Sequence, residues 1–203
     1  TTNGGHIYAG GGSASETLNG LSVPSEYATS GTNTLSGITI AGTTINSVGG
    51  SIRMKGSNNS VDGANAGIIV YNSTLNSGAG SLSMYGQRTG NPNTSAGLFI
   101  GTDMNSASLA TGNVSISSTS GDIYLEGTTA SINNSYSWCH GLAIVEYFGD
   151  DVSITSTTGN ISLFGDASNA AAYAGEAVGF VIQSGSTSSL TNIATDGGNI
   201  LIN

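Results

Sequence analysis

Apolar and polar residues alternate in a short segment that recurs along the chain, most clearly at residues 121–127, where Ile123 and Leu125 flank Tyr124. Strict alternation predicts a β-strand with one face in a core and the other face outside. The segment recurs at spacings of 45, 30, 41, 38 and 39 residues. Self-similarity at such periods is typical of a repeat architecture. The six copies begin at Gly5, Gly50, Gly80, Gly121, Gly159 and Gly198.

Two weaker apolar segments follow each copy. The second segment comes directly after a glycine, and we place it at residues 20–23, 67–70, 97–100, 141–145 and 179–182. The third segment precedes the next copy, and we place it at residues 38–40, position 75, and residues 114–116, 152–154 and 190–193. The pattern therefore predicts three short strands in each unit. We expect no helix, because no longer stretch has helical spacing.

Copies that keep their order and polarity fit a coil that winds once per unit and pairs like strands in parallel sheets, and two smaller coils per unit are an alternative that fits the same period. Parallel crossovers are right-handed. We therefore predict an all-β fold, a right-handed parallel β-helix of about five three-stranded coils of irregular length, with residues 1–203 as a single solenoid segment. We attribute the recurring glycines to corners that need positive φ. Because the first and last copies are interrupted, we predict that the chain is part of a longer repeat array or an open-ended subunit.

The predicted core consists of the apolar positions that alternate inward on the first two strands of each unit. A charged side chain at such a position is expected to unfold the neighbouring coils. The predicted core residues are Ile52, Met54, Leu82, Met84, Ile123, Leu125, Ile161, Leu163, Ile68, Val70, Leu98, Ile100, Ile144 and Val181.

Charged residues make up 7% of the chain, and its net charge is −9. A chain with this charge repels phosphate backbones, so we expect no nucleic-acid partner. The chain contains no apolar run long enough for a membrane span. The single Cys139 excludes an internal disulfide framework and a cysteine-based zinc site, and we expect it to be a buried thiol. We expect no cofactor and no metal.

Residues 151–165, which read Asp-Val-Ser-Ile-Thr-Ser-Thr-Thr-Gly-Asn-Ile-Ser-Leu-Phe-Gly, resemble the repeats of filamentous-haemagglutinin-type exoproteins. Those proteins are large bacterial adhesins exported by two-partner secretion and built as right-handed β-helical shafts. The resemblance extends over nearly the whole chain. It implies a non-catalytic structural or adhesive segment of a secreted or cell-surface bacterial protein. The implied partners are adjacent β-helical segments or copies of the chain, together with host or matrix glycans.

The most variable stretches lie between the first and second strands of the units, and stacking would bring them to one edge, where solenoids often bind partners. On this edge Tyr136, Trp138 and His140, with Tyr173 one unit later, suit sugar recognition by aromatic rings beside polar groups. The alternative is that Trp138 packs over the end of the core. Three sequons on the same edge are candidate glycosylation sites, namely Asn58, Asn93 and Asn133.

The sequence is compatible with two alternative functions. A β-helical polysaccharide-active enzyme or tailspike-like glycan binder is suggested by Asp150-Asp151 and His140-Gly141, which resemble polygalacturonase motifs. Their order is reversed and the expected basic motif is missing, so we expect no catalysis and interpret both aspartates as solvated turn residues. With Glu146 they could supply oxygen ligands to calcium, but the calcium-roll repeat is absent.

The other alternative is a subunit of an extracellular filament that grows by head-to-tail stacking. In that arrangement the last strand, with Ile200 and Ile202, pairs with the strand at Ile7 of the next copy. Unpaired strand edges make such growth physically natural.

Overall fold

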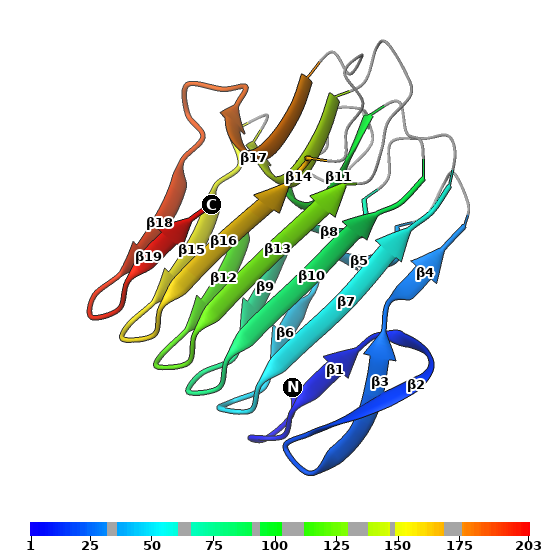
Figure 1. Ribbon diagram of the computed structural model, residues 1–203. Coiled ribbons are helices and arrows are strands. Elements are labelled where there is room, and N and C mark those ends of the chain that lie inside the picture. Colours follow the sequence, from blue (N-terminus) through cyan, green and yellow to red (C-terminus); the bar gives the residue numbers. More distant parts are fainter. Residues whose placement is uncertain are drawn as a thin grey trace.

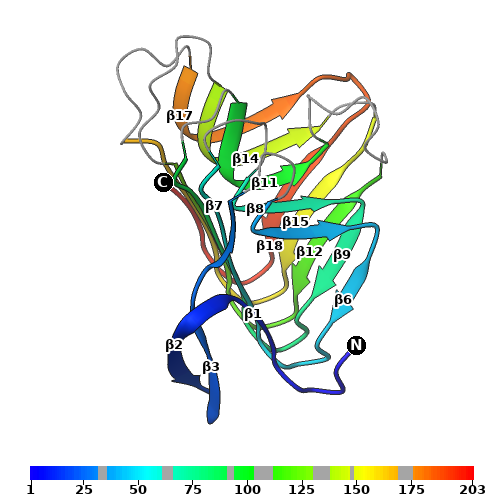
Figure 2. The same cartoon turned by 90° about the vertical axis from the view of Figure 1, so that its right-hand side faces the viewer.

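The computed structural model is a three-sided, right-handed parallel β-helix, which confirms the predicted fold class. It describes residues 1–31, 36–60, 66–90, 94–102, 112–129, 138–146, 149–168 and 176–203, with only the backbone described at positions 94, 95, 138 and 176. Three parallel sheets form the sides of a prism (Figures 1 and 2). The described residues complete five coils and begin a sixth.

The first sheet is built from the recurring alternating segment. Its central strands pair without any register shift, so that each residue of one coil lies beside its counterpart in the next. The strands in this sheet are, in spatial order, β1 (Ile7–Ala9), β7 (Ile52–Asn58), β10 (Leu82–Arg88), β13 (Ile123–Thr129), β16 (Ile161–Asp166) and β19 (Ile200–Ile202), with β4 (Ala28–Ser30) also paired to β7.

The second and third sheets follow the same coil order. The first and third sheets converge at one edge of the prism, and the second sheet closes the opposite side (Figure 2). The second sheet contains β5 (Ile38–Ala41), β8 (Ile68–Tyr71), β11 (Thr94–Gly101), β14 (Trp138–Glu146) and β17 (Glu176–Ser184). The third sheet contains β6 (Thr44–Asn46), β9 (Ser73–Asn76), β12 (Val114–Ser118), β15 (Val152–Ser156) and β18 (Thr191–Thr195).

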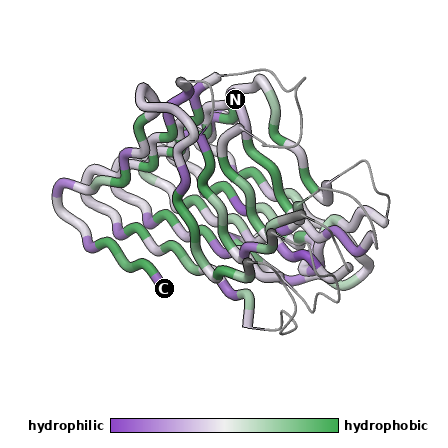
Figure 3. The backbone as a smooth tube through the Cα atoms, turned by 90° about the horizontal axis from the view of Figure 1, so that it is seen from above, coloured by the Kyte–Doolittle hydropathy of each residue, from purple (hydrophilic) through white to green (hydrophobic). Residues whose placement is uncertain are grey.

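The core is a set of apolar columns that run along the solenoid axis. Ile123, for example, is fully buried between Leu82 and Ile161 of the neighbouring coils. Hydrophobic positions therefore recur side by side in successive coils (Figure 3). Every predicted core residue is buried except Val181, which lies beside Ala143 in a smaller apolar cluster separate from the main core. The prediction for Val181 was wrong because residues 180–182 are all apolar, so alternation does not show which face is inward.

The first coil departs from the prediction. Residues 20–23 do not form its second strand, because most of them belong to an antiparallel hairpin of β2 (Gly11–Leu18) and β3 (Leu21–Glu26). The second strand is instead β5, whose residues 38–40 were predicted as the third strand. This hairpin is an insertion between β1 and β4 that lengthens the first unit, so the spacing used to assign the strands does not apply there. The hairpin lies against the outer side of the first sheet (Figure 2).

From Gly50 onwards the recurring glycines are required by the close approach of neighbouring backbones, and not by positive φ as predicted. A Cβ added at Gly121 would lie 2.1 Å from the carbonyl oxygen of Gly80 in the preceding coil. At the next corner a Cβ on Gly127 would lie 2.0 Å from the oxygen of Gly141. Non-bonded atoms do not approach this closely, so any side chain at either corner would have to push the two backbones apart.

A hydroxyl residue three positions before the first glycine of each segment ties the coils together. Ser118 Oγ donates a hydrogen bond of 2.7 Å to the oxygen of Gly121 in its own turn, and it lies 3.4 Å from the oxygen of Gly80 in the preceding coil. This Ser/Thr-x-x-Gly turn was missed in the sequence, although it occurs in all six copies. Its hydroxyl residues are Thr2, Ser47, Ser77, Ser118, Ser156 and Thr195.

Candidate functional site

The predicted aromatic cluster falls mostly outside the described residues. Tyr136 and Tyr173 both lie there, and Trp138 is described only as the first backbone position of β14. His140 is 6% exposed, because it lies within β14 and not on an open loop. The proposed sugar site at this edge therefore stays a prediction, and its histidine is largely withdrawn from solvent.

The expected exposure of Asn58 is wrong. Its side chain is fully buried, because β7 continues to this residue and pairs it with Arg88. Asn58 Oδ1 accepts hydrogen bonds from the Ser60 backbone N–H at 2.9 Å, from Ser60 Oγ at 2.8 Å, and from the guanidinium of Arg88. The other two sequons, at Asn93 and Asn133, lie outside the described residues.

Arg88 is the largest fully buried side chain among the described residues. Its guanidinium donates to Asn58 Oδ1, to Ser60 Oγ at 3.0 Å and to the Ser60 carbonyl oxygen at 2.9 Å. Burial lowers the pKa of Arg88 to about 10, with an opposing contribution from the buried Cys139. Arg88 therefore stays charged at neutral pH and ties β10 to the segment after β7, which is a structural role.

The carboxylates considered for catalysis and for calcium support a corner of the fold. Asp150 is 8% exposed and accepts a hydrogen bond of 2.7 Å from Thr102 Oγ1, so the expectation that it is solvated was wrong. Asp151 Oδ1 accepts from the backbone N–H of Leu190 at 2.9 Å. Glu146 is 1% exposed and accepts from the hydroxyl of Thr191. Burial raises the pKa of Glu146.

No group of three or more His, Cys, Asp or Glu side chains suited to holding a metal ion occurs in the part of the chain that the structure describes. Within the same residues, no helix is long and apolar enough to cross a bilayer.

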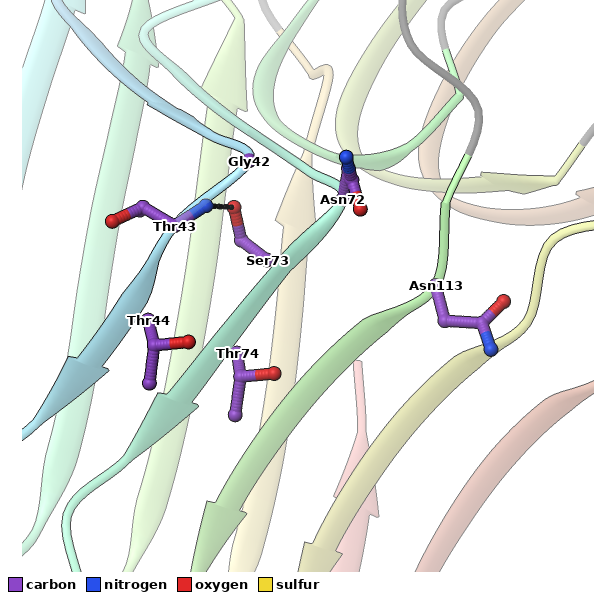
Figure 4. Close-up of a pocket in the computed structure, with 7 residues that line it drawn as sticks. All are labelled: Gly42, Thr43, Thr44, Asn72, Ser73, Thr74 and Asn113. Carbon is purple, nitrogen blue, oxygen red and sulfur yellow. Dashed lines mark hydrogen bonds between the residues drawn. The ribbon is translucent and has the colours of Figure 1, made fainter.

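A polar recess of about 240 Å³ lies at the corner between the second and third sheets (Figure 4). The Thr43 backbone N–H donates to Ser73 Oγ at 3.2 Å, and Ser73 Oγ donates to the carbonyl oxygen of Tyr71 at 2.7 Å. These bonds occupy the serine hydroxyl in holding the corner. The lining is entirely small or polar, consisting of Gly42, Thr43, Thr44, Asn72, Ser73, Thr74 and Asn113.

The outer face of the first sheet carries a different kind of surface, which we call the tyrosine face and define by Tyr8, Arg53, Tyr85 and Tyr124. The Tyr85 and Tyr124 rings have centroids 5.4 Å apart and are tilted by 38°. The Arg53 guanidinium lies 5.5 Å from the Tyr85 ring centroid. Residues on neighbouring coils therefore form a continuous aromatic and cationic contact along the solenoid axis.

Tyr124 also donates a hydrogen bond of 2.6 Å from its hydroxyl to Glu126 Oε2. Burial and this bond raise the pKa of Tyr124, so its phenol keeps its proton throughout the physiological range. The bond fixes the direction of the ring's polar end and leaves the ring of Tyr124 half-buried on the sheet.

The inserted hairpin packs against one end of the tyrosine face. Glu16 Oε1 lies 3.1 Å from Arg53 Nη1, and Asn19 Nδ2 donates to the Tyr8 hydroxyl at 2.7 Å. Lys55 donates to the carbonyl oxygen of Ser25 in the same hairpin. Both cationic residues that are not fully buried are thus engaged by the hairpin, and the charge of Arg53 is balanced by a carboxylate.

Two recesses lie on the tyrosine face. The hairpin recess has a volume of about 300 Å³, and the axial recess, towards β19, has a volume of about 520 Å³. The hairpin recess is lined by Tyr8, Leu18, Asn19, Ser51, Arg53, Ser81, Ser83 and Tyr85. The axial recess is lined by Tyr85, Asp122, Ile123, Tyr124, Asn160, Ser162, Asn199 and Leu201.

A hydrogen-bonded polar ladder borders the axial recess. Asp122 Oδ1 accepts from the backbone N–H of Asn160 at 2.8 Å and from its Nδ2 at 3.0 Å. Asn160 Oδ1 accepts in the same way from Asn199, at 3.0 and 3.1 Å. The three side chains are exposed, yet each is held in a fixed orientation by hydrogen bonds to a neighbouring coil.

The tyrosine face was missed in the sequence because its residues are far apart along the chain. Tyr85 and Tyr124 are separated by a whole unit, and only the register of β10 against β13 brings their columns together. A signal was nevertheless present, since both tyrosines occupy polar-side positions of the alternating segment. Aligning the six copies and comparing their outward positions would have placed them on one face.

The residues proposed for end-to-end stacking lie in the outermost strands of the first sheet. Ile7 in β1 is half-buried and pairs with Ile52, whereas Ile200 and Ile202 in β19 are 44% and 50% exposed. β19 itself is the hydrophobic segment that runs to the C-terminus in Figure 3. Stacking through these residues stays a prediction.

Compared with protein-family models, curated proteins and solved structures, the chain shows no significant match.

Proposed function

We propose that this chain is a non-catalytic structural and adhesive β-solenoid of a secreted or cell-surface bacterial protein. In this role it acts as a stiff element that holds a binding surface away from its attachment point. The observation that supports the proposal is the unbroken register of the first sheet, in which β7, β10 and β13 pair residue by residue over their full length. Columns of apolar side chains, glycines and turn hydroxyls repeat along the same axis.

Such a structure is suited to bearing load. Each coil contacts mainly its neighbours, so the fold resists bending through many equivalent contacts along its length. The backbone hydrogen bonds of the parallel sheets run along the axis. Pulling the two ends apart must therefore break all the hydrogen bonds between two neighbouring coils together.

Adhesion is tested with beads coated with the folded protein and brought onto glass that carries immobilised polysaccharides. We expect wild-type beads to adhere to at least one neutral polysaccharide surface, and beads coated with urea-unfolded protein not to adhere. The soluble polysaccharide recovered after incubation is expected to keep its length. Absence of adhesion to every surface would overturn the adhesive role, and shortening of the polysaccharide would show that the chain is an enzyme.

A second role is favoured by the exposed edge of β19. Ile200, Leu201 and Ile202 are 44%, 61% and 50% exposed, and their columns continue those of the preceding coils. We propose that a further coil, from an adjacent solenoid segment or from a second copy, pairs along this edge.

Light scattering coupled to size-exclusion chromatography tests pairing between copies. We expect the average mass to rise with concentration, and the rise to disappear in Ile202→Lys. The control is Ser115→Lys, which adds the same charge on the outer face of the third sheet. A wild-type mass that stays monomeric at all concentrations would exclude self-association and leave pairing with another segment.

A further inference from the structure

We propose that the tyrosine face binds a neutral oligosaccharide, which lies along the solenoid axis across the hairpin recess and the axial recess. This inference rests on the proposed adhesive function and names its binding surface and ligand class. It places the binding surface on the outer face of the first sheet and not on the loop edge expected from the sequence.

The recesses arise from the sizes of the side chains in one outward column. In that column Ser83 and Ser162 are small, and each lies next to Tyr124. The two serines are two coils apart, which corresponds to about 10 Å along the axis. Small residues at alternate coils therefore open two shallow depressions, and Tyr124 stands between them. The full column reads Tyr8, Arg53, Ser83, Tyr124, Ser162 and Leu201.

Aromatic rings are available to both depressions. Tyr85 lines the hairpin recess and the axial recess, and Tyr124 lines the second of these. Both rings are half-buried on the outer face of the sheet, so part of each ring is open to solvent. The C–H faces of a pyranose ring pack favourably on such surfaces, because the ring is apolar there while its hydroxyls point sideways.

The sideways hydroxyls would meet fixed hydrogen-bonding groups. Along the axial recess these are the exposed side chains of Asp122, Asn160 and Asn199, and in the hairpin recess they include Asn19 and Ser81. The ladder bonds between Asp122, Asn160 and Asn199 already hold these groups in place. Polar groups that are ordered before binding lose little conformational entropy when the ligand arrives.

The charges on this face favour an uncharged ligand. The chain carries a net charge of −9, and Asp122 and Glu126 lie on or beside the axial recess. Arg53, the cation in the hairpin recess, lies 3.1 Å from Glu16. An acidic polysaccharide would therefore meet the carboxylates of the axial recess while the cation of the hairpin recess is already paired with Glu16, whereas a neutral one can bond to hydroxyl and amide groups and to carboxylate acceptors.

The corner recess between the second and third sheets is a weaker candidate for the same ligand. Its lining of threonine, serine and asparagine supplies hydrogen bonds but no aromatic face, and its volume of about 240 Å³ is the smallest of the three. The ligand class therefore fits the tyrosine face better, where both kinds of contact are present.

Isothermal titration calorimetry with defined hexasaccharides tests the inference. The probes are cellohexaose, chitohexaose and maltohexaose, with hexagalacturonate as the anionic comparison. We expect wild-type protein to bind at least one neutral hexasaccharide and to bind hexagalacturonate more weakly. Tyr85→Ser and Tyr124→Ser should each weaken binding by about threefold to tenfold, in line with the strength of aromatic contacts. Ser162→Trp should also weaken binding, because the indole fills the axial recess.

The serine substitutions are chosen because the chain already carries serine at outward positions of the same sheet, so the fold should tolerate them. Circular dichroism melting of each variant checks this. The matched control is Tyr71→Ser, which removes a tyrosine from the end of β8 in the second sheet. Binding by this control should equal that of the wild type.

The outcomes separate this inference from the proposed function. Unchanged hexasaccharide binding in the Tyr85→Ser, Tyr124→Ser double variant would overturn the tyrosine face as the site and leave adhesion intact. Tighter binding of hexagalacturonate than of every neutral probe would overturn the ligand class. Wild-type protein that binds no hexasaccharide would overturn the inference, whereas loss of bead adhesion to every polysaccharide surface would overturn the proposed function as well.

Discussion

Replacing Gly121 by alanine tests whether the glycine columns are set by the distance between coils. The added Cβ would lie 2.1 Å from the oxygen of Gly80 and 2.3 Å from its carbonyl carbon. An ordinary contact of about 3.4 Å requires the two coils to separate locally by roughly 1.3 Å, because protein interiors are packed too densely to absorb the methyl group otherwise. Both of the conflicting atoms belong to backbone, so no side-chain rotation can relieve the overlap.

The cost follows from the contacts at this corner. Overpacking of a dense site costs about 1–3 kcal/mol. Separation also weakens the 2.9 Å bond from the Leu82 N–H to the Asp122 oxygen and the contact of Ser118 with Gly80, at about 0.5–1.5 kcal/mol for each bond. Lower entropy of the unfolded chain returns about 0.4–1 kcal/mol. We therefore expect Gly121→Ala to lower the free energy of unfolding by about 2–4 kcal/mol.

The chain offers a matched control at Gly5, which has the same place in the turn motif. There an added Cβ would meet only Thr2, at 3.5 Å from its Cβ. Gly5→Ala should be neutral or stabilising by up to about 1 kcal/mol. Urea unfolding followed by circular dichroism measures both variants. Equal stabilities for Gly121→Ala and Gly5→Ala would refute the argument that coil spacing selects glycine.

Three further predictions concern buried groups. Ile123→Lys should unfold the middle coils, because the charge enters a fully buried column, while Thr128→Lys on the outer side of the same strand should melt like the wild type. Arg88→Met should lower the free energy of unfolding by about 1–3 kcal/mol per buried acceptor left unpaired, as measured in urea, and a loss below 0.5 kcal/mol, roughly the scale of surface changes, would contradict its structural role. Because the pKa of Glu146 is raised, the folded state holds the carboxyl proton of Glu146 more tightly than the unfolded state does. The stabilisation from this bound proton is therefore fully present below the ordinary pKa of 4.5 and is lost as the pH rises through the folded pKa. Glu146→Gln should therefore remove part of the decline in stability between acidic and neutral pH, and an identical pH profile for both proteins would exclude Glu146 as its source.

The strands of the first sheet could be predicted because their signal is local. Alternation at Ile123 and Leu125 fixes which side chains face inward, and burial of a whole column rewards the same pattern in every copy. Where alternation is absent the prediction failed, as at Val181, whose neighbours on both sides are apolar. The first coil was misassigned for another reason, because the β2–β3 hairpin changed the spacing without changing the local pattern.

The candidate site could not be predicted in the same way. The loop edge was predicted as the site because unusual residues such as Trp138 and His140 cluster there in the sequence. The tyrosine face is made of ordinary residues that are dispersed over many units, and its recesses depend on serines at Ser83 and Ser162 lying beside Tyr124. Nothing in the local sequence distinguishes these serines from the many others in the chain.

By itself the sequence determined that this chain is a β-solenoid, because a period and an alternating pattern are properties of the order of residues and require only that like strands stack. It also determined most of the core, since inward positions follow from the period of two along a strand. Only the tertiary structure decided which distant residues share a surface. That depends on the exact register between coils and on the insertion packed against the first sheet. A surface assembled across coils is a property of spacing in three dimensions, and it is there that the binding face lies under our proposal.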